Sequence, residues 1–204
     1  MNDSKGPTRR GDPAPGDDPA RSLRELVARH AIDVRLAAHL SLLADAGVPI
    51  VVGGSAPLRF AIVEALAAAS PVPSAAGRGA EIFVVANDGF SWLADPAAVG
   101  CLQPGAGSAP RSPRETRLRA SGLADSLDAT TTRCLVRALV RGFPLLADAA
   151  EADLAALLAR LRATPNRIPE ADLARLGAVS FVHGDRVAAA HLLRSEEHTS
   201  ELQS

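Results

Sequence analysis

Apolar residues along the chain follow two spacings, one typical of helices and one typical of buried strands. Segments with three- and four-residue spacing alternate with short β-branched runs that are bounded by Gly and Pro. This pattern predicts helices at 22–31, 34–47, 58–70, 129–142, 150–163 and 170–177. It predicts strands at 48–52, 80–86, 114–123 and 143–148, followed by an antiparallel pair of strands within 178–193.

Local signals support several of these boundaries. Asp33 has the residue type of an N-cap for the helix at 34–47, which Gly47 ends. Gly142 suits a helix C-cap, and residues 183–185 mark the turn of a C-terminal β-hairpin. Because strands alternate with helices, we expect an α/β fold in which a mostly parallel sheet has helices on both faces.

The two ends of the chain lack the pattern of a folded domain. Residues 1–21 are rich in Pro, Gly, Asp and Arg, so we expect a disordered N-terminal arm. Residues 194–204, RSEEHTSELQS, resemble a translation of common sequencing-adapter DNA, and we interpret them as an artefactual tail. The expected folded domain is therefore 22–193. Two alternatives stay open: native C-terminal residues are missing, or the chain is a misassembled fragment with no selected function.

Composition argues against several classes of function. The formal net charge is −1 and the arginine-rich segments lack interleaved aromatic residues, so we expect no binding to nucleic acid. No apolar run reaches the ~18–20 residues of a membrane helix, and the N-terminus has no apolar secretory region, which predicts a cytoplasmic protein. Cys101 and Cys134 lie far apart without a nearby histidine pair, so we expect reduced thiols and no metal site.

A predicted strand, a glycine-containing loop and a predicted helix follow one another at 48–66, VPIVVGGSAPLRFAIVEAL. Phosphate-binding loops occur in this context, because backbone N–H groups and the helix dipole attract the anion. A working loop reads G-x-x-x-x-G-K-[ST]. If Gly53 is the first glycine, then Leu58 replaces the second glycine, Arg59 replaces the lysine, and Phe60 replaces the hydroxyl residue that binds Mg²⁺.

Four stretches make the chain resemble the P-loop ATPases of the type II/type IV secretion superfamily, in particular a small stand-alone bacterial branch. They are LAAHLSLLADAGVPIVVGG, FSWL, LARLGAVSFV and RVAAAHLLR, and the similarity runs from about Leu36 to Arg194. The resemblance implies a RecA-type P-loop fold and nucleotide as the ligand. It implies that the nucleotide-binding positions are Gly53, Gly54, Ser55, Arg59 and Phe60.

The acidic motifs of that family are reduced in this chain. Asn87 and Asp88 stand where the resemblance places the catalytic Glu and its neighbouring Asp, and Asn87 cannot act as a base. Gly122 and Asp125 are nearest to the Walker B motif, which has no Glu here, and the family's His segment maps to LLADAAEAD, which has no His. Asp88 and Asp125 are therefore the remaining candidates for catalytic residues, and we expect no well-formed Mg²⁺ site.

The resemblance implies an ATPase, whereas the departures favour a pseudo-ATPase. We expect a binding or regulatory protein, with an intact ATPase paralogue or a second copy of itself as partner, and the alternative is a weakly active ATPase. The expected cofactor is ATP or ADP without a well-formed metal site, or none. Two residue-level alternatives stay open: Gly53 and Gly54 form a tight turn or a phosphate site, and Arg59 is solvated or contacts an anion.

Overall fold

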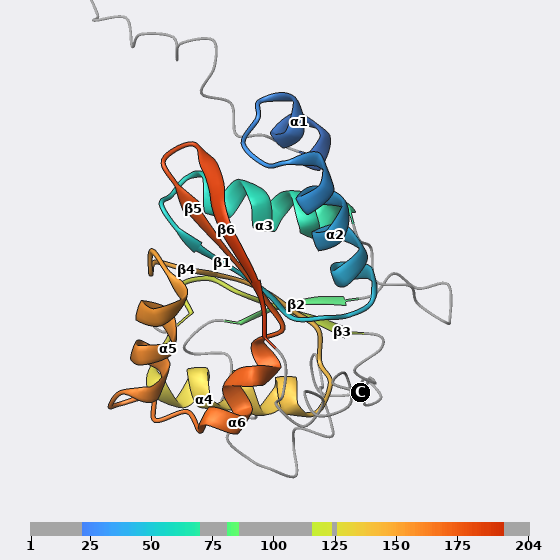
Figure 1. Cartoon of the computed structure of the whole chain (residues 1–204). Helices are drawn as coiled ribbons and strands as arrows, with labels where there is room; N and C mark the ends of the chain where they lie inside the picture. The colour runs from blue at the N-terminus through green and yellow to red at the C-terminus, as the bar shows by residue number, and fades with distance from the viewer. Residues whose placement is uncertain (1–21, 70–80, 86–115, 124–125, 194–204) are drawn as a thin grey trace, which may run out of the picture.

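The computed structural model describes residues 22–69, 81–85, 116–123 and 126–193, with the backbone alone described at 81–85 and at Thr116. Its strands form one six-stranded sheet in the order β2-β3-β4-β1-β5-β6 (Figure 1). The strands are β1 (Ile50–Gly54), β2 (Glu81–Val85), β3 (Thr116–Ala120), β4 (Leu145–Ala149), β5 (Ala178–His183) and β6 (Arg186–Leu192). Strands β2, β3, β4, β1 and β5 are parallel, and β6 pairs antiparallel with β5. The predicted α/β class with a mostly parallel sheet is confirmed.

Helices cover both faces of this sheet (Figure 1). One face packs against α1 (Leu23–Ala28), α2 (Val34–Asp45) and α3 (Leu58–Ala69). The other packs against α4 (Ala129–Val140), α5 (Leu154–Arg162) and α6 (Glu170–Leu173), which a short 3₁₀ helix at Ala174–Leu176 continues. Side chains of β1 alternate between the two layers, since Val51 lies in the α4–α6 cluster while Ile50 and Val52 lie in the α1–α3 cluster.

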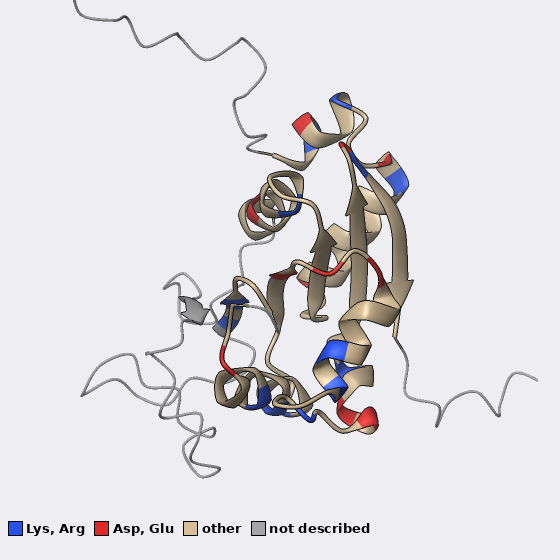
Figure 2. Cartoon of the chain, turned by 90° about the vertical axis from the view of Figure 1, so that its left-hand side faces the viewer, with Lys and Arg blue, Asp and Glu red and all other residues tan. Residues whose placement is uncertain are grey.

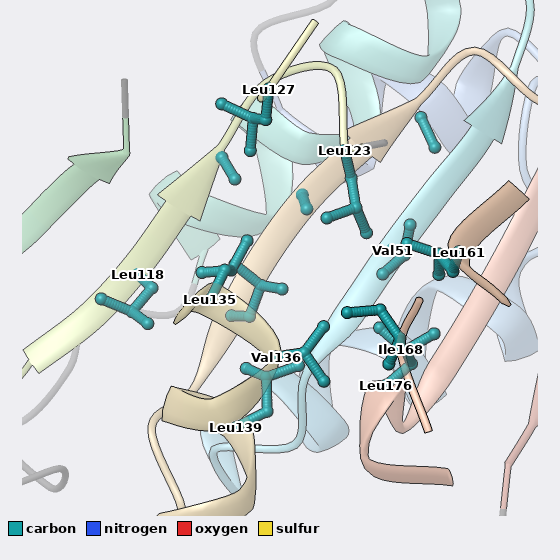
Figure 3. Packing of buried hydrophobic residues seen from close by; sticks show 14 of the residues in the cluster. Val51, Leu118, Leu123, Leu127, Leu135, Val136, Leu139, Leu161, Ile168 and Leu176 are labelled. Carbon is teal, nitrogen blue, oxygen red and sulfur yellow. The ribbon is translucent and has the colours of Figure 1, made fainter. Parts of the chain in front are cut away.

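Leucines are the most frequent side chains in the cluster between the sheet and the α4–α6 layer, which also contains Phe143 and Phe181. Figure 3 shows Leu135 of α4 near Leu118 of β3, Leu139 beside Val136 on the same helix, and Leu161 of α5 beside Val51. Burial of each such leucine contributes about 2 kcal/mol to stability relative to an exposed position. These contacts hold the strands in register, and they thereby fix where the strand ends lie at the edge of the sheet.

Aspartate side chains cap three of the helices. Asp33 accepts hydrogen bonds from the amides of Arg35 (2.8 Å) and Leu36 (3.3 Å), which confirms the predicted N-cap of α2. Asp128 caps α4 and Asp153 caps α5 in the same way. Because Asp153 is a cap, α5 begins only at Leu154, four residues later than the apolar spacing predicted.

A buried arginine joins β3 to the end of α2. Arg117 is 3% exposed, and its Nη2 donates to the carbonyl oxygen of Ala44 at 2.8 Å. Burial lowers the pKa of Arg117, while the nearby Asp45 carboxylate acts in the opposite direction. The cation stands at the negative end of the α2 dipole, so β3 is tied to this helix by a polar contact as well as by packing.

Charged residues lie mainly on helices and connecting segments, whereas the central strands are largely uncharged (Figure 2). Over the part of the chain that the structure describes, no helix combines the length and apolar character needed to cross a membrane.

Candidate functional site

The connections that follow β1 and β4 leave the sheet toward opposite faces. β1 and β4 are neighbouring parallel strands, and α3, which follows β1, packs in the first layer. The α5 helix, which follows β4, packs in the second. In open α/β sheets such a reversal is the place where ligands bind, just outside the carboxyl ends of the strands. The candidate site therefore lies where β1 and β4 end, which is also where the predicted phosphate loop falls.

The two glycines of the predicted loop belong to β1 itself. We expected the strand to end at residue 52, but it continues through Gly53 and Gly54, which pair with Phe181 and Val182 of β5. A Cβ atom on Gly53 would lie 2.5 Å from the Phe181 ring, and one on Gly54 would lie 2.1 Å from the Val182 carbonyl oxygen. The close approach of β5 therefore accounts for both glycines without a ligand.

Ser55, which follows β1, hydrogen-bonds to the end of β5 and to the turn between β5 and β6. Its hydroxyl donates to the carbonyl oxygen of Gly184 at 3.3 Å, and its amide points to the carbonyl oxygen of Val182 at 3.4 Å. The Ser55 carbonyl oxygen in turn accepts from the amide of Arg59 at 3.4 Å. Two amides that a phosphate loop would offer to its ligand are thus directed at protein carbonyl groups, although both contacts are long.

Arg59 lies against the carboxyl end of β1 and makes its contacts inside the protein. Its Nη1 donates to the carbonyl oxygen of Gly54 at 2.7 Å, and its Nε lies 3.4 Å from Oδ2 of Asp148. The Arg59 side chain is 13% exposed and that of Asp148 is 4% exposed, so this ion pair is largely removed from water. Arg59 is therefore not fully solvated, and the anion that it contacts in this structure is a carboxylate of the same chain.

Asp148 connects three segments at the edge of the sheet. Its Oδ2 accepts from the amide of Gly122, in the turn after β3, at 3.2 Å, and it is the same oxygen that faces Arg59. The backbone carbonyl of Asp148 accepts from the amide of Leu123 at 2.8 Å. One carboxylate of β4 therefore holds the β3 turn and the first turn of α3 together.

A second carboxylate follows β4 at Glu151. Its Oε1 lies 3.4 Å from Nε of Arg160 on α5, and its side chain is 9% exposed. The other oxygen, Oε2, is buried without a hydrogen-bond partner. The backbone oxygen of Glu151 lies 2.8 Å from where a Cβ on Gly53 would stand, so this residue borders the same strand ends. Asp148 and Glu151 therefore place two carboxylates near these strand ends, each already paired with an arginine of its own, Arg59 and Arg160.

Phe60 occupies the position at which the predicted phosphate loop would carry a hydroxyl. It is 39% exposed, and the guanidinium carbon of Arg59 lies 4.7 Å from the centre of its ring. The ring offers no ligand to Mg²⁺. Among the residues that the structure describes, no three His, Cys, Asp or Glu side chains come close enough to share a metal ion.

The structure brings together Gly53, Gly54, Ser55, Arg59 and Phe60 at one edge of the sheet. The other two candidates, Asp88 and Asp125, lie outside the described residues, as does the aromatic stretch at 90–93. Sequence reasoning missed Asp148 and Glu151. A signal was present for Asp148, because it is an acidic residue at the end of a predicted apolar strand.

Comparison of the chain with protein-family models and with curated protein sequences gives no match.

Proposed function

We propose that this protein is a P-loop NTPase-like domain that works as a binding or regulatory protein and does not hydrolyse nucleotide efficiently. The observation that carries the proposal is the contact between Arg59, at the lysine position of the loop, and Asp148. In a working loop the cation at this position meets the β- and γ-phosphates. Here an internal carboxylate and the carbonyl oxygen of Gly54 take those contacts.

The residues around this pair support the same conclusion. The resemblance to secretion ATPases requires a hydroxyl for Mg²⁺ at the position of Phe60, whose ring lies against Arg59 instead. Metal-assisted phosphoryl transfer depends on that ion to neutralise the charge that develops in the transition state. Without it, the remaining scaffold is suited to holding a partner, for which we propose an intact ATPase of the same superfamily or a second copy of this chain.

Calorimetric titration of the full-length protein with ATP and ADP, each with and without Mg²⁺, tests this function. The proposal predicts no Mg²⁺-dependent binding in either case. Arg59→Ala identifies any binding that uses the loop, and Arg137→Ala, an exposed arginine on α4 in the opposite layer, is the matched control. Micromolar binding that requires Mg²⁺ and is lost only in Arg59→Ala would contradict the proposal and favour a weakly active ATPase.

A further inference from the structure

We propose that Asp148 regulates the same edge by competing with oxyanions for Arg59, so that a phosphate group binds there only when this carboxylate is displaced from the arginine. This inference rests on the proposed function, because it concerns the loop at the end of β1. It goes further by naming the ligand class, a phosphate-type oxyanion that binds without a metal ion, and by naming Asp148 as the group that excludes this ligand.

The geometry of Arg59 is that of an incompletely satisfied cation. Its Nη1 has a short hydrogen bond to Gly54, but its Nε is buried and has no hydrogen-bond partner. The Nε to Oδ2 separation of 3.4 Å is longer than the ~2.7–2.9 Å of a charge-assisted hydrogen bond. A guanidinium group can form two parallel bonds with an oxyanion, and Asp148 does not provide them. The internal carboxylate is therefore a partner that a better-placed oxyanion could replace.

Electrostatics explain why the folded protein excludes such an ion while Asp148 is charged. Asp148 is 3% exposed, so a phosphate brought to Arg59 would meet a negative charge that water screens poorly. Arg59 already balances that charge, and one cation cannot balance both anions. If the carboxylate is displaced, or a neutral side chain replaces it, the same buried cation loses its counter-ion and attracts an external one.

The chain offers a neutral variant that preserves the rest of the site. Asp148→Asn retains an acceptor for the amide of Gly122. In the original protein this amide donates to Oδ2 of Asp148 and positions the turn after β3. Glu151→Gln is a matched control, because it removes a carboxylate of similar burial that follows the same strand but pairs with Arg160. Asp148→Asn combined with Arg59→Ala tests whether any gain in binding acts through the arginine.

The experiment is calorimetric titration of the full-length proteins with inorganic pyrophosphate in EDTA at fixed ionic strength. We expect Asp148→Asn to bind at least about tenfold more tightly than the original protein, a difference of about 1.4 kcal/mol. Glu151→Gln should match the original protein, and the double variant should lose the gain. Far-UV circular dichroism and urea unfolding establish that each variant is folded. If Asp148→Asn does not fold, Asp148→Ser is tested in its place as a second neutral variant.

Three results would overturn the inference. The first is a folded Asp148→Asn or Asp148→Ser protein that binds pyrophosphate no more tightly than the original, and the second is a gain that survives in the double variant. The third, which needs no Asp148 variant, is micromolar pyrophosphate binding by the original protein that Arg59→Ala removes. These results concern binding without metal, so they are distinct from Mg²⁺-dependent nucleotide binding, which would contradict the proposed function.

Discussion

Gly54 and Val182 lie so close across β1 and β5 that a Cβ atom on Gly54 would stand 2.1 Å from the Val182 carbonyl oxygen. Gly54 also has φ of +101°, a backbone conformation that residues other than glycine rarely adopt. Both constraints come from the sheet. The glycine that sequence reasoning assigned to a phosphate loop is therefore required by strand pairing.

The first prediction follows from this contact. Gly54→Ala should lower the free energy of unfolding by about 3 kcal/mol, because the methyl group forces β1 and β5 apart and the backbone is strained. Gly142→Ala is the control, since Gly142 has φ of +87° but no atom within 4 Å of its Cβ position, so only the ~1–2 kcal/mol conformational cost remains. Urea unfolding of both variants measures the difference, and equal losses would argue against the close approach of β5.

The second prediction concerns the buried carboxylate of β4. Asp148→Ala should destabilise the protein by about 3 kcal/mol, because it leaves Arg59 without its anion and the Gly122 amide without its acceptor. Glu170→Ala removes a surface partner of Arg162, with side chains 73% and 45% exposed, and should cost under about 1 kcal/mol. Chemical denaturation compares the two. Similar values would show that the Arg59–Asp148 pair behaves as a surface contact.

The third prediction is a dependence of stability on pH at the start of α4. Backbone and side-chain hydrogen bonds from Thr131 hold the pKa of Asp128 below its ordinary value. A carboxylate with a depressed folded pKa stabilises the protein above its unfolded pKa of about 3.9, and this contribution is lost as pH falls through the folded pKa. Asp128→Ala should therefore cost about 1 kcal/mol at pH 7 and progressively less in acid.

Asp128→Asn separates capping from titration. Asparagine also caps helices but carries no charge, so this variant should retain most of the stability at pH 7 and should lack the acid-dependent part. Unfolding curves between pH 3 and pH 7 measure both variants. A cost of Asp128→Ala that stays constant over that range would contradict the assignment of this carboxylate as the titrating cap.

The fourth prediction concerns the thiol of Cys134. This side chain is 4% exposed, and burial raises its pKa, an effect that Arg137 and Arg133 oppose. A thiol reagent reacts with the thiolate, so Cys134 should be unreactive in the folded protein at pH 8 and should react fully in urea. A Cys101→Ser background leaves Cys134 as the only thiol in the chain. Rapid labelling without denaturant would show that α4 is less well packed than described.

The architecture could be predicted from the sequence because each element carries its own local signal. The run at 48–52 is β-branched, the run at 154–161 has leucines at helical spacing, and Asp33 has the chemistry of a cap. These signals depend on neighbours in the chain. They were enough to predict a mostly parallel sheet with helices between its strands.

The candidate site could be predicted only in part, because its chemistry depends on neighbours in space. Gly53, Ser55 and Arg59 were found from one contiguous motif, whereas the partner of Arg59 lies 89 positions further along the chain, since 148 − 59 = 89. Which strand lies beside β1 is not encoded in the motif. Sequence spacing could not reveal that an internal carboxylate faces the arginine, or that β5 approaches both glycines too closely for a side chain.

The most direct test of whether this edge supports catalysis is phosphate release from saturating Mg·ATP, measured for the full-length protein and for Arg59→Ala in parallel. Phe60 and the Arg59–Asp148 pair lead us to expect that both proteins release phosphate only at the rate of the protein-free control. Release above that background by the original protein, absent in folded Arg59→Ala, would contradict the account.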